Sequence, residues 1–320
     1  MPINITTGPT GEANKVVFFG PQGVGKTTLA SQYKIGPVIF IDMEGSTTDY
    51  DLKRIVCSNW KDVDEATDYL ITEDHPYKTV VYDTVTAWEK FAEAKILLNE
   101  KKNRMGDFTF GRGSILIREE TDLFVFGLDP LVRRGINVVL NAHSIVKRYQ
   151  PPELPDGYDR HVLAMDEKAA ATLKRWAKAV LFVNFKTQVI ETDERKTRGT
   201  GGDKRIIYTR HRAAHDGKNR FGLPEEIPFE NGAWPEALNA FFSTPVLSPA
   251  SDGLFEKFCE VVADIPAEAL KSYLIERGTI TEQDNSKAIP EEFLKLVVDN
   301  AEAFQAALVE FTKERERAAA

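Results

Sequence analysis

Cysteine is scarce in this 320-residue sequence, which contains only Cys57 and Cys259. The two are too far apart in the chain to form a short metal-ligand motif, so we expect no structural zinc site. So little cysteine is typical of a protein of the reducing cytoplasm. The sequence also lacks a secretory signal pattern and any apolar run of the roughly 18–20 residues that a membrane span needs. We therefore expect a cytoplasmic protein that does not contact a membrane.

Excess positive charge is missing as well, because the formal net charge is −8 at pH 7. This excludes a surface that binds any polyanion without discrimination. Most of the negative excess lies near the end of the chain, where residues 246–320 contain eight Lys and Arg against fifteen Asp and Glu. The part before it is almost neutral, which leaves room for local basic loops.

Short apolar segments alternate with longer amphipathic ones along the first part of the chain. The short segments are rich in Val, Ile and Phe without polar alternation, which is typical of strands buried on both faces of a parallel sheet. They are Lys15–Gly20, Pro37–Asp42, Thr79–Asp83, Asn137–Ala142 and Ala179–Phe185. The segments expected to be helical are Lys26–Lys34, Asp62–Ile71, Trp88–Lys101, Ile115–Arg134 and Glu167–Lys178. This alternation predicts an α/β fold around a mostly parallel central sheet.

A different pattern follows the last of these strands. Gln188–Glu191 and Arg205–Thr209 flank a polar stretch with three glycines, which predicts a β-hairpin added to the sheet. Ser243–Ser251 is rich in Pro and Ser and is predicted to be a linker. Four amphipathic helices are expected after it, at Asp252–Val262, Ala267–Arg277, Pro290–Asn300 and Ala301–Arg317. The sequence thus predicts an α/β core over residues 1–245 and an acidic helical region over residues 246–320.

A glycine-rich segment joins the first predicted strand to the first predicted helix. Its spacing is G-x-x-x-x-G-K-[ST], a pattern that requires a strand before it and a helix after it. The glycines let backbone N–H groups surround phosphates, and the helix N-terminus adds positive potential. Lys26 is expected to reach the β- and γ-phosphates, and Thr27 to supply a hydroxyl to Mg²⁺. The pattern predicts that ATP and Mg²⁺ bind through Gly20, Pro21, Gln22, Gly23, Val24, Gly25, Lys26, Thr27 and Thr28.

Polar residues follow three of the other predicted strands. Asp83 is expected to hold Mg²⁺ through water, although a capping aspartate would look the same in the sequence. Glu44 is placed to activate an attacking water, with a solvated loop residue as the alternative and Asp42 as a competitor for the role. His143 is expected near the γ-phosphate, whose presence it would report, unless it is a satisfied structural histidine.

Together these residues resemble the core of the RecA and RadA recombinases. In that family the catalytic glutamate lies in a strand-end pattern like Ile41–Gly45, and a sensor residue, usually Gln, corresponds in position to His143. Lys218-Asn219-Arg220-Phe221-Gly222 is similar to a motif of bacterial RadA proteins, in which the Lys and the Arg approach ATP bound by the neighbouring subunit. The resemblance implies a homo-oligomer, either a ring or a filament, in which Lys218 and Arg220 act in trans.

The likeness covers about Lys15–Phe242 and is strongest to phage-encoded, core-only RecA-like ATPases of the Sak group, which are linked to single-strand annealing and recombination. Gly135–Ser144 and Tyr208–Pro224 carry it. Because the phosphate loop already begins at Gly20, we expect no separate N-terminal oligomerisation domain. The resemblance implies an ATPase that is stimulated by single-stranded DNA (ssDNA) and works in the cytoplasm of a bacterial host.

Two segments of mixed cations and aromatics correspond by position to the DNA-binding loops of that family. Cations bind phosphates and aromatic faces stack on unpaired bases, although mobile solvated loops are the alternative. The candidate residues are Lys101, Lys102, Arg104, Phe108, Phe110 and Arg112 in the first segment, and Lys147, Arg148 and Tyr149 in the second, which runs on to Arg160. A third basic segment, Arg195–Arg198 with Lys204 and Arg205, is more typical of a solvated turn.

Three functions are compatible with the sequence. The first is an oligomeric, ssDNA-stimulated ATPase of recombination or annealing. The second is a replicative helicase or a helicase loader built on the same core. The third is a nucleotide-switched interaction protein whose acidic tail recruits a protein partner.

Overall fold

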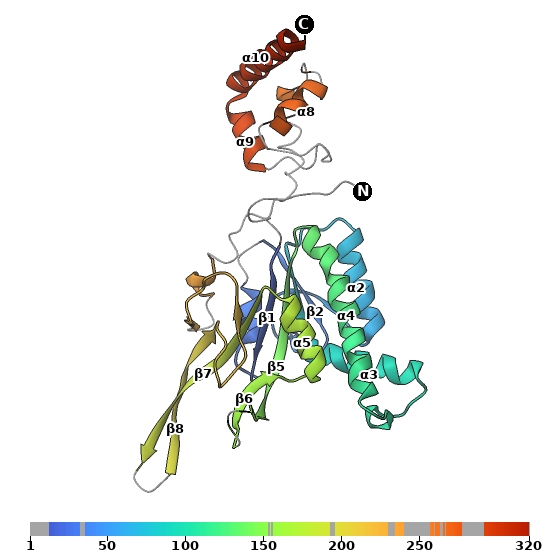
Figure 1. Ribbon diagram of the computed structural model, residues 1–320, viewed down its shortest axis with the longest axis vertical. Helices are drawn as coiled ribbons and strands as arrows, with labels where there is room; N and C mark the ends of the chain where they lie inside the picture. The colour runs from blue at the N-terminus through green and yellow to red at the C-terminus, as the bar shows by residue number, and fades with distance from the viewer. Residues whose placement is uncertain are drawn as a thin grey trace. The chain divides into compact units, whose positions relative to one another are not determined.

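The computed structural model describes residues 13–32, 36–152, 154, 156–192, 196–229, 234–239, 257–258, 260–262, 265, 267–276 and 291–319. The chain divides into two compact units, Glu12–Thr244 and a C-terminal unit within Pro245–Ala320, which are described separately (Figure 1). Within the described ranges, no helix is both long and apolar enough to cross a membrane.

A ten-stranded sheet forms the centre of the first unit. Its strands are β1 (Lys15–Gly20), β2 (Val38–Asp42), β3 (Lys53–Val56), β4 (Thr79–Asp83), β5 (Asn137–Tyr149), β6 (Tyr158–Leu163), β7 (Ala179–Thr192), β8 (Lys196–Tyr208), β9 (Lys218–Asn219) and β10 (Glu226–Phe229). The main path runs β10-β8-β7-β1-β5-β4-β2-β3, with β6 beside β5 and β9 beside β7. All neighbours from β7 to β3 pair in parallel, whereas β8 is antiparallel to both of its neighbours. The predicted α/β fold with a mostly parallel sheet is confirmed.

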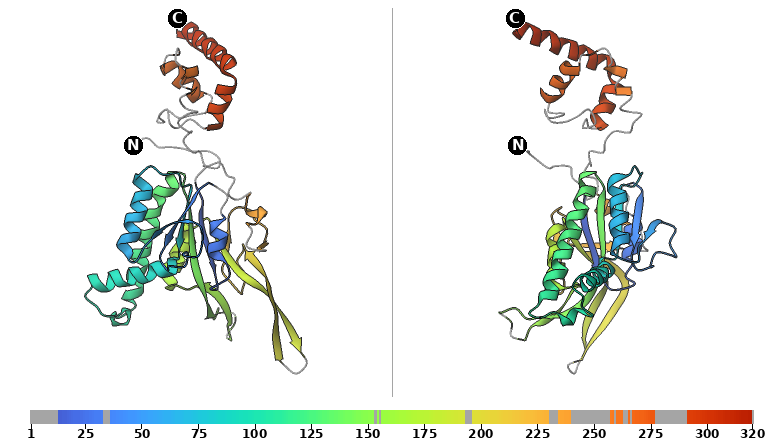
Figure 2. Two further views of the ribbon diagram at one scale, coloured as in Figure 1. Left: turned by 180° about the vertical axis from the view of Figure 1, so that it is seen from behind. Right: turned by 90° about the vertical axis from the view of Figure 1, so that its right-hand side faces the viewer.

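Helices cover both faces of this sheet (Figures 1 and 2). They are α1 (Lys26–Ser31), α2 (Trp60–Thr72), α3 (Val85–Asn99), α4 (Arg112–Arg133) and α5 (Glu167–Trp176), with the short 3₁₀ helices η1 (Met105–Asp107) and η2 (Glu236–Leu238). On one face, Leu29 of α1 packs into a core that contains Val81 of β4. The next residue, Tyr82, points to the other face, where its hydroxyl lies 2.8 Å from the hydroxyl of Thr67 on α2 and its ring meets Phe124 of α4 edge-on. Burial on both faces explains why these strands are apolar without alternation.

β5 extends well beyond its predicted end, and β7 and β8 form the predicted hairpin with longer strands. Four strands were not expected: β3, β6, β9 and β10. The apolar parts of β5 and β7 end near Ala142 and Phe185, but both strands continue into polar extensions that project from the sheet. β3 was missed because it is a short edge strand with two cations in its four residues. An edge strand has one free side, so it needs no continuous apolar run.

The C-terminal unit has a hydrophobic core of its own. Its main helices are α8 (Ala267–Glu276), α9 (Glu291–Asp299) and α10 (Ala301–Ala319). Tyr273 of α8 packs edge-on against Phe304 and Phe311 of α10, and Leu294 of α9 is fully buried beside them. The predicted helices of this region are present where the chain is described. The predicted linker Ser243–Ser251 lies outside the described residues.

Candidate functional site

The glycine-rich segment closes tightly between β1 and α1. A Cβ atom at Gly20 would lie 2.1 Å from the carbonyl oxygen of Val183, so only glycine lets β1 end this close to β7. Gly25 precedes α1 with a φ of 97°, a left-handed conformation that favours glycine. Val24 is buried in the core beneath the segment and anchors it. The local fold is therefore that of a phosphate-binding loop leading into a helix N-terminus.

Lys26, the first residue of α1, lies inside this loop. Its Nζ donates hydrogen bonds to the carbonyl oxygens of Gly20 at 3.1 Å and Pro21 at 2.9 Å. The residue is only 6% exposed. Burial lowers the pKa of Lys26 to about 8, although the carboxylates of Asp83 and Glu44 act to raise it. Phosphate oxygens would replace the solvation that this ammonium has lost.

Two oxygen ligands of the kind that Mg²⁺ prefers converge beside the lysine. Thr27 donates its hydroxyl to Oδ2 of Asp83 at 2.7 Å. Asp83 is buried, which raises the pKa of its carboxyl, while the hydrogen bond from Thr27 lowers it. A hydroxyl and a buried carboxylate in contact next to a phosphate loop fit a magnesium site whose other ligands are waters and phosphate oxygens.

Glu44 faces the same pocket from the end of β2. His143, on β5, places its Nε2 3.1 Å from both carboxylate oxygens of Glu44, and Thr84 donates its hydroxyl to one of them. A carboxylate accepts hydrogen bonds only, so Nε2 carries a proton in this arrangement. The hydrogen bond from His143 is the largest cause that lowers the pKa of Glu44, and Thr84 adds to it. Glu44 is therefore held as a carboxylate.

Asp42, the alternative candidate for the base that activates water, has a structural role instead. Its Oδ1 accepts from the backbone N–H of Glu44 at 3.1 Å and of Gly45 at 2.8 Å. Its Oδ2 accepts from both the backbone and the hydroxyl of Thr47. The side chain is fully buried. Asp42 shapes the turn that aims Glu44 and has no oxygen left for a water.

The pocket around these side chains has a volume of about 300 Å³. Thirteen residues line it: Gln22, Gly23, Gly25, Lys26, Thr27, Thr28, Glu44, Ser46, Tyr50, Asp83, Thr84, His143 and Arg205. A family model described as AAA domain matches residues 12–221, which is well over half of the chain. The chain belongs to the AAA domain family. No curated protein matches it.

Membership of the AAA domain family makes the chain a P-loop ATPase and supports nucleotide binding at this pocket, usually with Mg²⁺. The AAA domain thus brings together residues that the sequence predicted from four separate segments: the phosphate loop, Glu44, Asp83 and His143. Their strands β1, β5, β4 and β2 are consecutive in the sheet, and parallel strands present their carboxyl ends at one edge.

The motif around Lys218 lies elsewhere in the AAA domain. β9 pairs with the first residues of β7, four residues before the point where β7 passes Gly20. Lys218 donates to the carbonyl oxygens of Lys174, Arg175 and Ala177 at the end of α5. These bonds engage the ammonium as a helix C-terminal cap within the chain, and the contact of Lys218 with a neighbouring subunit's ATP stays a prediction.

Arg220 differs from the rest of its motif. Asn219 braces the following turn by accepting from the N–H of Phe221 at 3.0 Å and donating to the carbonyl of Leu223 at 2.9 Å. Arg220 is exposed, and no hydrogen bond or ion pair joins its side chain to another described residue. The two glutamates that follow the motif pair with other cations: Glu225 with Arg210 and Arg212, and Glu226 with Lys186 and Arg212. Of the five motif residues, Arg220 alone is presented to solvent as a charge.

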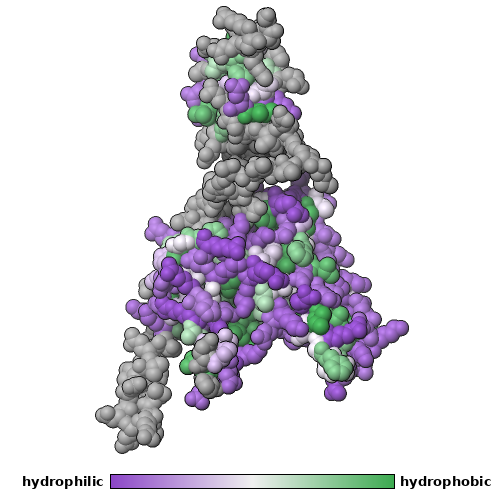
Figure 3. Space-filling view, in the orientation of Figure 1, coloured by the Kyte–Doolittle hydropathy of each residue, from purple (hydrophilic) through white to green (hydrophobic). Residues whose placement is uncertain are grey.

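The first candidate DNA segment connects α3 to α4. Phe110 is fully exposed there, whereas Phe108 is half-buried. Arg104 pairs with Asp107, and Arg112 with Glu100. Lys101 and Lys102 are exposed and have no partner among the described residues. Figure 3 shows apolar surface interrupting the hydrophilic face at the end of the AAA domain where this segment lies.

The second candidate segment, expected to be a DNA-binding loop, forms a β-hairpin. β5 continues through Lys147, Arg148 and Tyr149 and pairs antiparallel with β6. Lys147 pairs with Glu167, and Arg148 with Asp159. Arg160 is buried in an ion pair with Asp216 at 2.8 Å, so it cannot take part in DNA contact. Both segments project at the same end of the unit (Figures 1 and 2).

Four pocket residues were not assigned to this site from the sequence: Ser46, Tyr50, Thr84 and Arg205. Thr84 had a local signal, because it directly follows Asp83 and caps α3 by accepting from the N–H of Ala87. Arg205 had no local signal for this site, because the sequence places it in a basic hairpin that we expected to be exposed to solvent. The tip residues of that third basic segment lie outside the described side chains.

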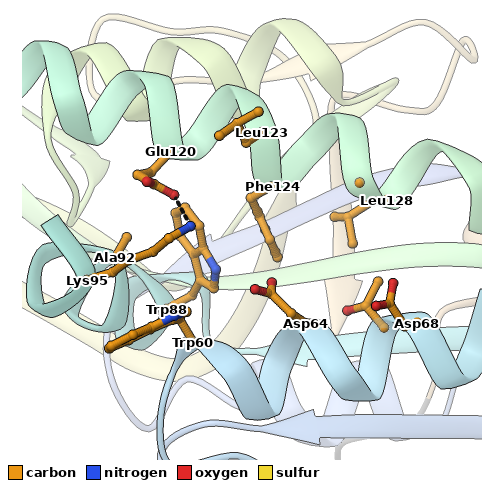
Figure 4. Close-up of a pocket in the computed structure, with 12 residues that line it drawn as sticks. Trp60, Asp64, Asp68, Trp88, Ala92, Lys95, Glu120, Leu123, Phe124 and Leu128 are labelled. Carbon is orange, nitrogen blue, oxygen red and sulfur yellow. Dashed lines mark hydrogen bonds and ion pairs between the residues drawn. The ribbon is translucent and has the colours of Figure 1, made fainter. Parts of the chain in front are cut away.

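A second cleft, of about 310 Å³, separates α2, α3 and α4 (Figure 4). Asp64 and Asp68 line one side, and Lys95 is paired with Glu120 on the other. Burial raises the pKa of Asp64, against the opposing effect of Lys95. The excess of carboxylates would repel phosphates, and no residue of the phosphate loop lines this cleft, so it is not a nucleotide site.

Proposed function

We propose that the chain is an ATP-hydrolysing, ssDNA-binding RecA-like protein that acts in DNA recombination or single-strand annealing. The observation that carries the proposal is the origin of the candidate base. Glu44 comes from the end of β2, whose last residue pairs with Asp83 at the end of β4. No glutamate follows Asp83 itself. This is the arrangement that the resemblance to the RecA and RadA core implies.

The chemistry of the pocket supports hydrolysis. Glu44 is ionised and hydrogen-bonded by His143 and Thr84, so its direction is fixed and it can accept a proton from an attacking water. Lys26 neutralises negative charge on the phosphates, and Thr27 and Asp83 hold the metal. Mg²⁺ bound there would supply further charge neutralisation on the phosphate oxygens.

The nucleotide pocket and a proposed DNA-binding segment share one strand, β5. His143 lies on β5, and the same strand continues into the β5–β6 hairpin through Lys147 and Arg148. The N–H of His143 donates to Thr86 of α3, which leads to the other candidate segment. A shift of His143 when γ-phosphate is present would therefore move both candidate DNA-binding segments. Their surface ion pairs are weak, so phosphates can replace the paired carboxylates.

The proposal includes assembly into a homo-oligomer, ring or filament, in which Arg220 completes the site of a neighbour. Its guanidinium is unpaired among the described residues, and the β9 strand that precedes it pairs with the first two residues of β7, before the point where β7 passes Gly20 of its own phosphate loop. A planar fork of fixed charge suits the negative charge that develops on phosphate oxygens. The C-terminal unit, with its separate core, is proposed to contact a protein partner.

Glu44→Gln tests the hydrolytic part of the proposal. The substitution keeps the shape and the hydrogen bonding of the side chain but removes its ability to take a proton. We expect Mg²⁺·ATP to bind with unchanged affinity while single-turnover hydrolysis falls on the order of 10²-fold or more. Glu65→Gln, at an exposed glutamate of α2, is the matched control and should leave both quantities unchanged.

Single-turnover hydrolysis by Glu44→Gln at the normal rate would contradict the assignment of the base. Loss of binding together with turnover would mean that Glu44 supports the pocket and not the chemical step.

A further inference from the structure

Arg205 is held between two aromatic rings on neighbouring strands. It lies directly opposite Phe185 of β7 and Phe229 of β10 in the two antiparallel pairings of β8. Directly opposed residues share a face of the sheet, so the three side chains form a row. The guanidinium carbon is 5.7 Å from the ring centroid of Phe185 and 6.0 Å from that of Phe229. These cation–π contacts hold the charged group in one place.

The row faces the phosphate loop. Arg205 lines the same pocket as Lys26 and Glu44. A Cβ atom at Gly25 would lie 3.5 Å from Nη1 of Arg205 and 3.3 Å from the ring of Phe229, so the guanidinium comes close to the loop backbone. In the sheet, β8 and β4 lie on opposite sides of β1. Arg205 therefore approaches the loop from the side opposite Asp83.

The charge of Arg205 is not balanced within the described part of the chain. Neither a hydrogen bond nor an ion pair joins its guanidinium to another described residue, and it is only half-exposed. Three other cations of this region pair with carboxylates instead: Lys186 and Arg212 with Glu226, and Arg210 with Glu225. A half-buried, unpaired guanidinium with five N–H donors fits an anion with several oxygens.

We propose that Arg205 binds the phosphate chain of the nucleotide held by its own subunit, from the side of the loop opposite Asp83. The inference rests on the nucleotide binding assigned above. It differs from the role of Arg220, because Arg205 acts in cis and contributes to affinity before any subunits assemble.

The test is binding of Mg²⁺·ADP and of inorganic tripolyphosphate to the full chain by calorimetry. Arg205→Gln should weaken both affinities at least about tenfold, because a charge-assisted contact to phosphate is lost. Arg205→Lys keeps the charge between the two rings but loses the planar fork, so an intermediate loss is expected. Lys204→Gln removes the neighbouring charge, which points to the other face of β8, and should change neither affinity.

If a folded Arg205→Gln variant binds both probes with unchanged affinity, the inference is overturned. Arg205 would then have only a packing role, and the variant would show only a lower melting temperature without nucleotide. Weaker binding of ADP with unchanged binding of tripolyphosphate would also overturn it, because the contact would then be to the base or the ribose. If Arg205→Gln does not fold, Arg205→Lys decides between the same outcomes. Lys26→Ala is the reference that should bind neither probe. If the native chain also binds neither probe, the nucleotide site itself is refuted.

Discussion

Asp42 and Glu44 are two residues apart, and their surroundings give two carboxylates different chemistry. Asp42 is fully buried and saturated by the N–H groups and the hydroxyl of its own turn. Glu44 faces the pocket, where His143 and Thr84 orient it. The sequence could place both carboxylates at the strand end but could not rank them by contacts. The turn that separates their roles is visible only in three dimensions.

Lys26 carries an electrostatic cost in the free protein. Its pKa in the folded state, about 8, lies below the ordinary value of 10.5. Between these two values the unfolded chain binds more protons than the folded chain, so the free energy of unfolding rises with pH in that window. At neutral pH, burial of this charge costs on the order of 3 kcal/mol. Phosphates bound beside the ammonium offset that cost.

Nucleotide binding should therefore take up a proton at alkaline pH. At pH 8.5, above the lowered pKa of Lys26, much of the free protein has a neutral lysine, and bound phosphates restore its charge, so we expect net proton uptake on binding. Calorimetric titration with Mg²⁺·ADP in two buffers of different ionisation enthalpy measures this uptake. The uptake should decline toward pH 7, where Lys26 is already charged. Binding without proton uptake at pH 8.5 would contradict the buried, partly neutral lysine.

At the scale of elements, two connections that project from one end of the sheet carry the proposed DNA contacts. The α3–α4 connection offers the exposed Phe110 and two cations, Lys101 and Lys102, without partners among the described residues. The β5–β6 hairpin offers Lys147 and Arg148, each in an exposed ion pair. A protein with a net charge of −8 can bind DNA only where cations are concentrated in this way.

Removing two cations from either element should weaken ssDNA binding. The variants are Lys102→Ala/Arg104→Ala and Lys147→Ala/Arg148→Ala, and each should lower the salt slope of the binding constant by about one per lost phosphate contact. Fluorescence anisotropy with a labelled oligonucleotide at several salt concentrations measures this. Lys53→Ala/Lys61→Ala, at exposed lysines of β3 and α2, is the matched control. Normal binding by both test variants would show that DNA contacts lie elsewhere.

The sequence predicted an element well where the element's own residues determine its structure, and poorly where contacts with distant residues determine it. Buried strands such as β1 and β4 were predicted with correct ends because burial on both faces leaves a continuous apolar run. The β5–β6 hairpin was missed because its strands are polar and stabilised mainly by each other. Long-range contacts gave no signal at all: Lys218 caps a helix more than forty residues earlier, and Arg205 reaches a loop about 180 residues away.

At the scale of the whole molecule, the proposed assembly rests on Arg220. Arg220 does not line the nucleotide pocket of its own subunit, and its exposed charge is available to the site of a neighbour. An arginine supplied in trans can be worth on the order of 10³ or more in rate. A surface arginine without that role would be worth about 1 kcal/mol or less in stability and would have no kinetic effect.

Mixing two inactive variants tests the shared site. Arg220→Ala keeps its phosphate loop and Lys26→Ala keeps its Arg220, so each should be nearly inactive alone, and a mixture should recover ATPase activity at mixed interfaces. Arg210→Ala, at an exposed arginine paired with Glu225, is the matched control and should stay active. No recovery on mixing, together with a rate per subunit that does not fall on dilution to monomers, would refute the trans role.

A response of the ATPase to ssDNA is measured by the steady-state ATPase rate as ssDNA is added. We expect a saturable rise with an unstructured oligonucleotide, a smaller rise with duplex DNA, suppression by salt, and no strand separation in a parallel unwinding assay. A rate that does not change with ssDNA would refute the proposed function and favour a nucleotide-switched interaction protein. ATP-dependent unwinding of a duplex would also refute it, in favour of a helicase.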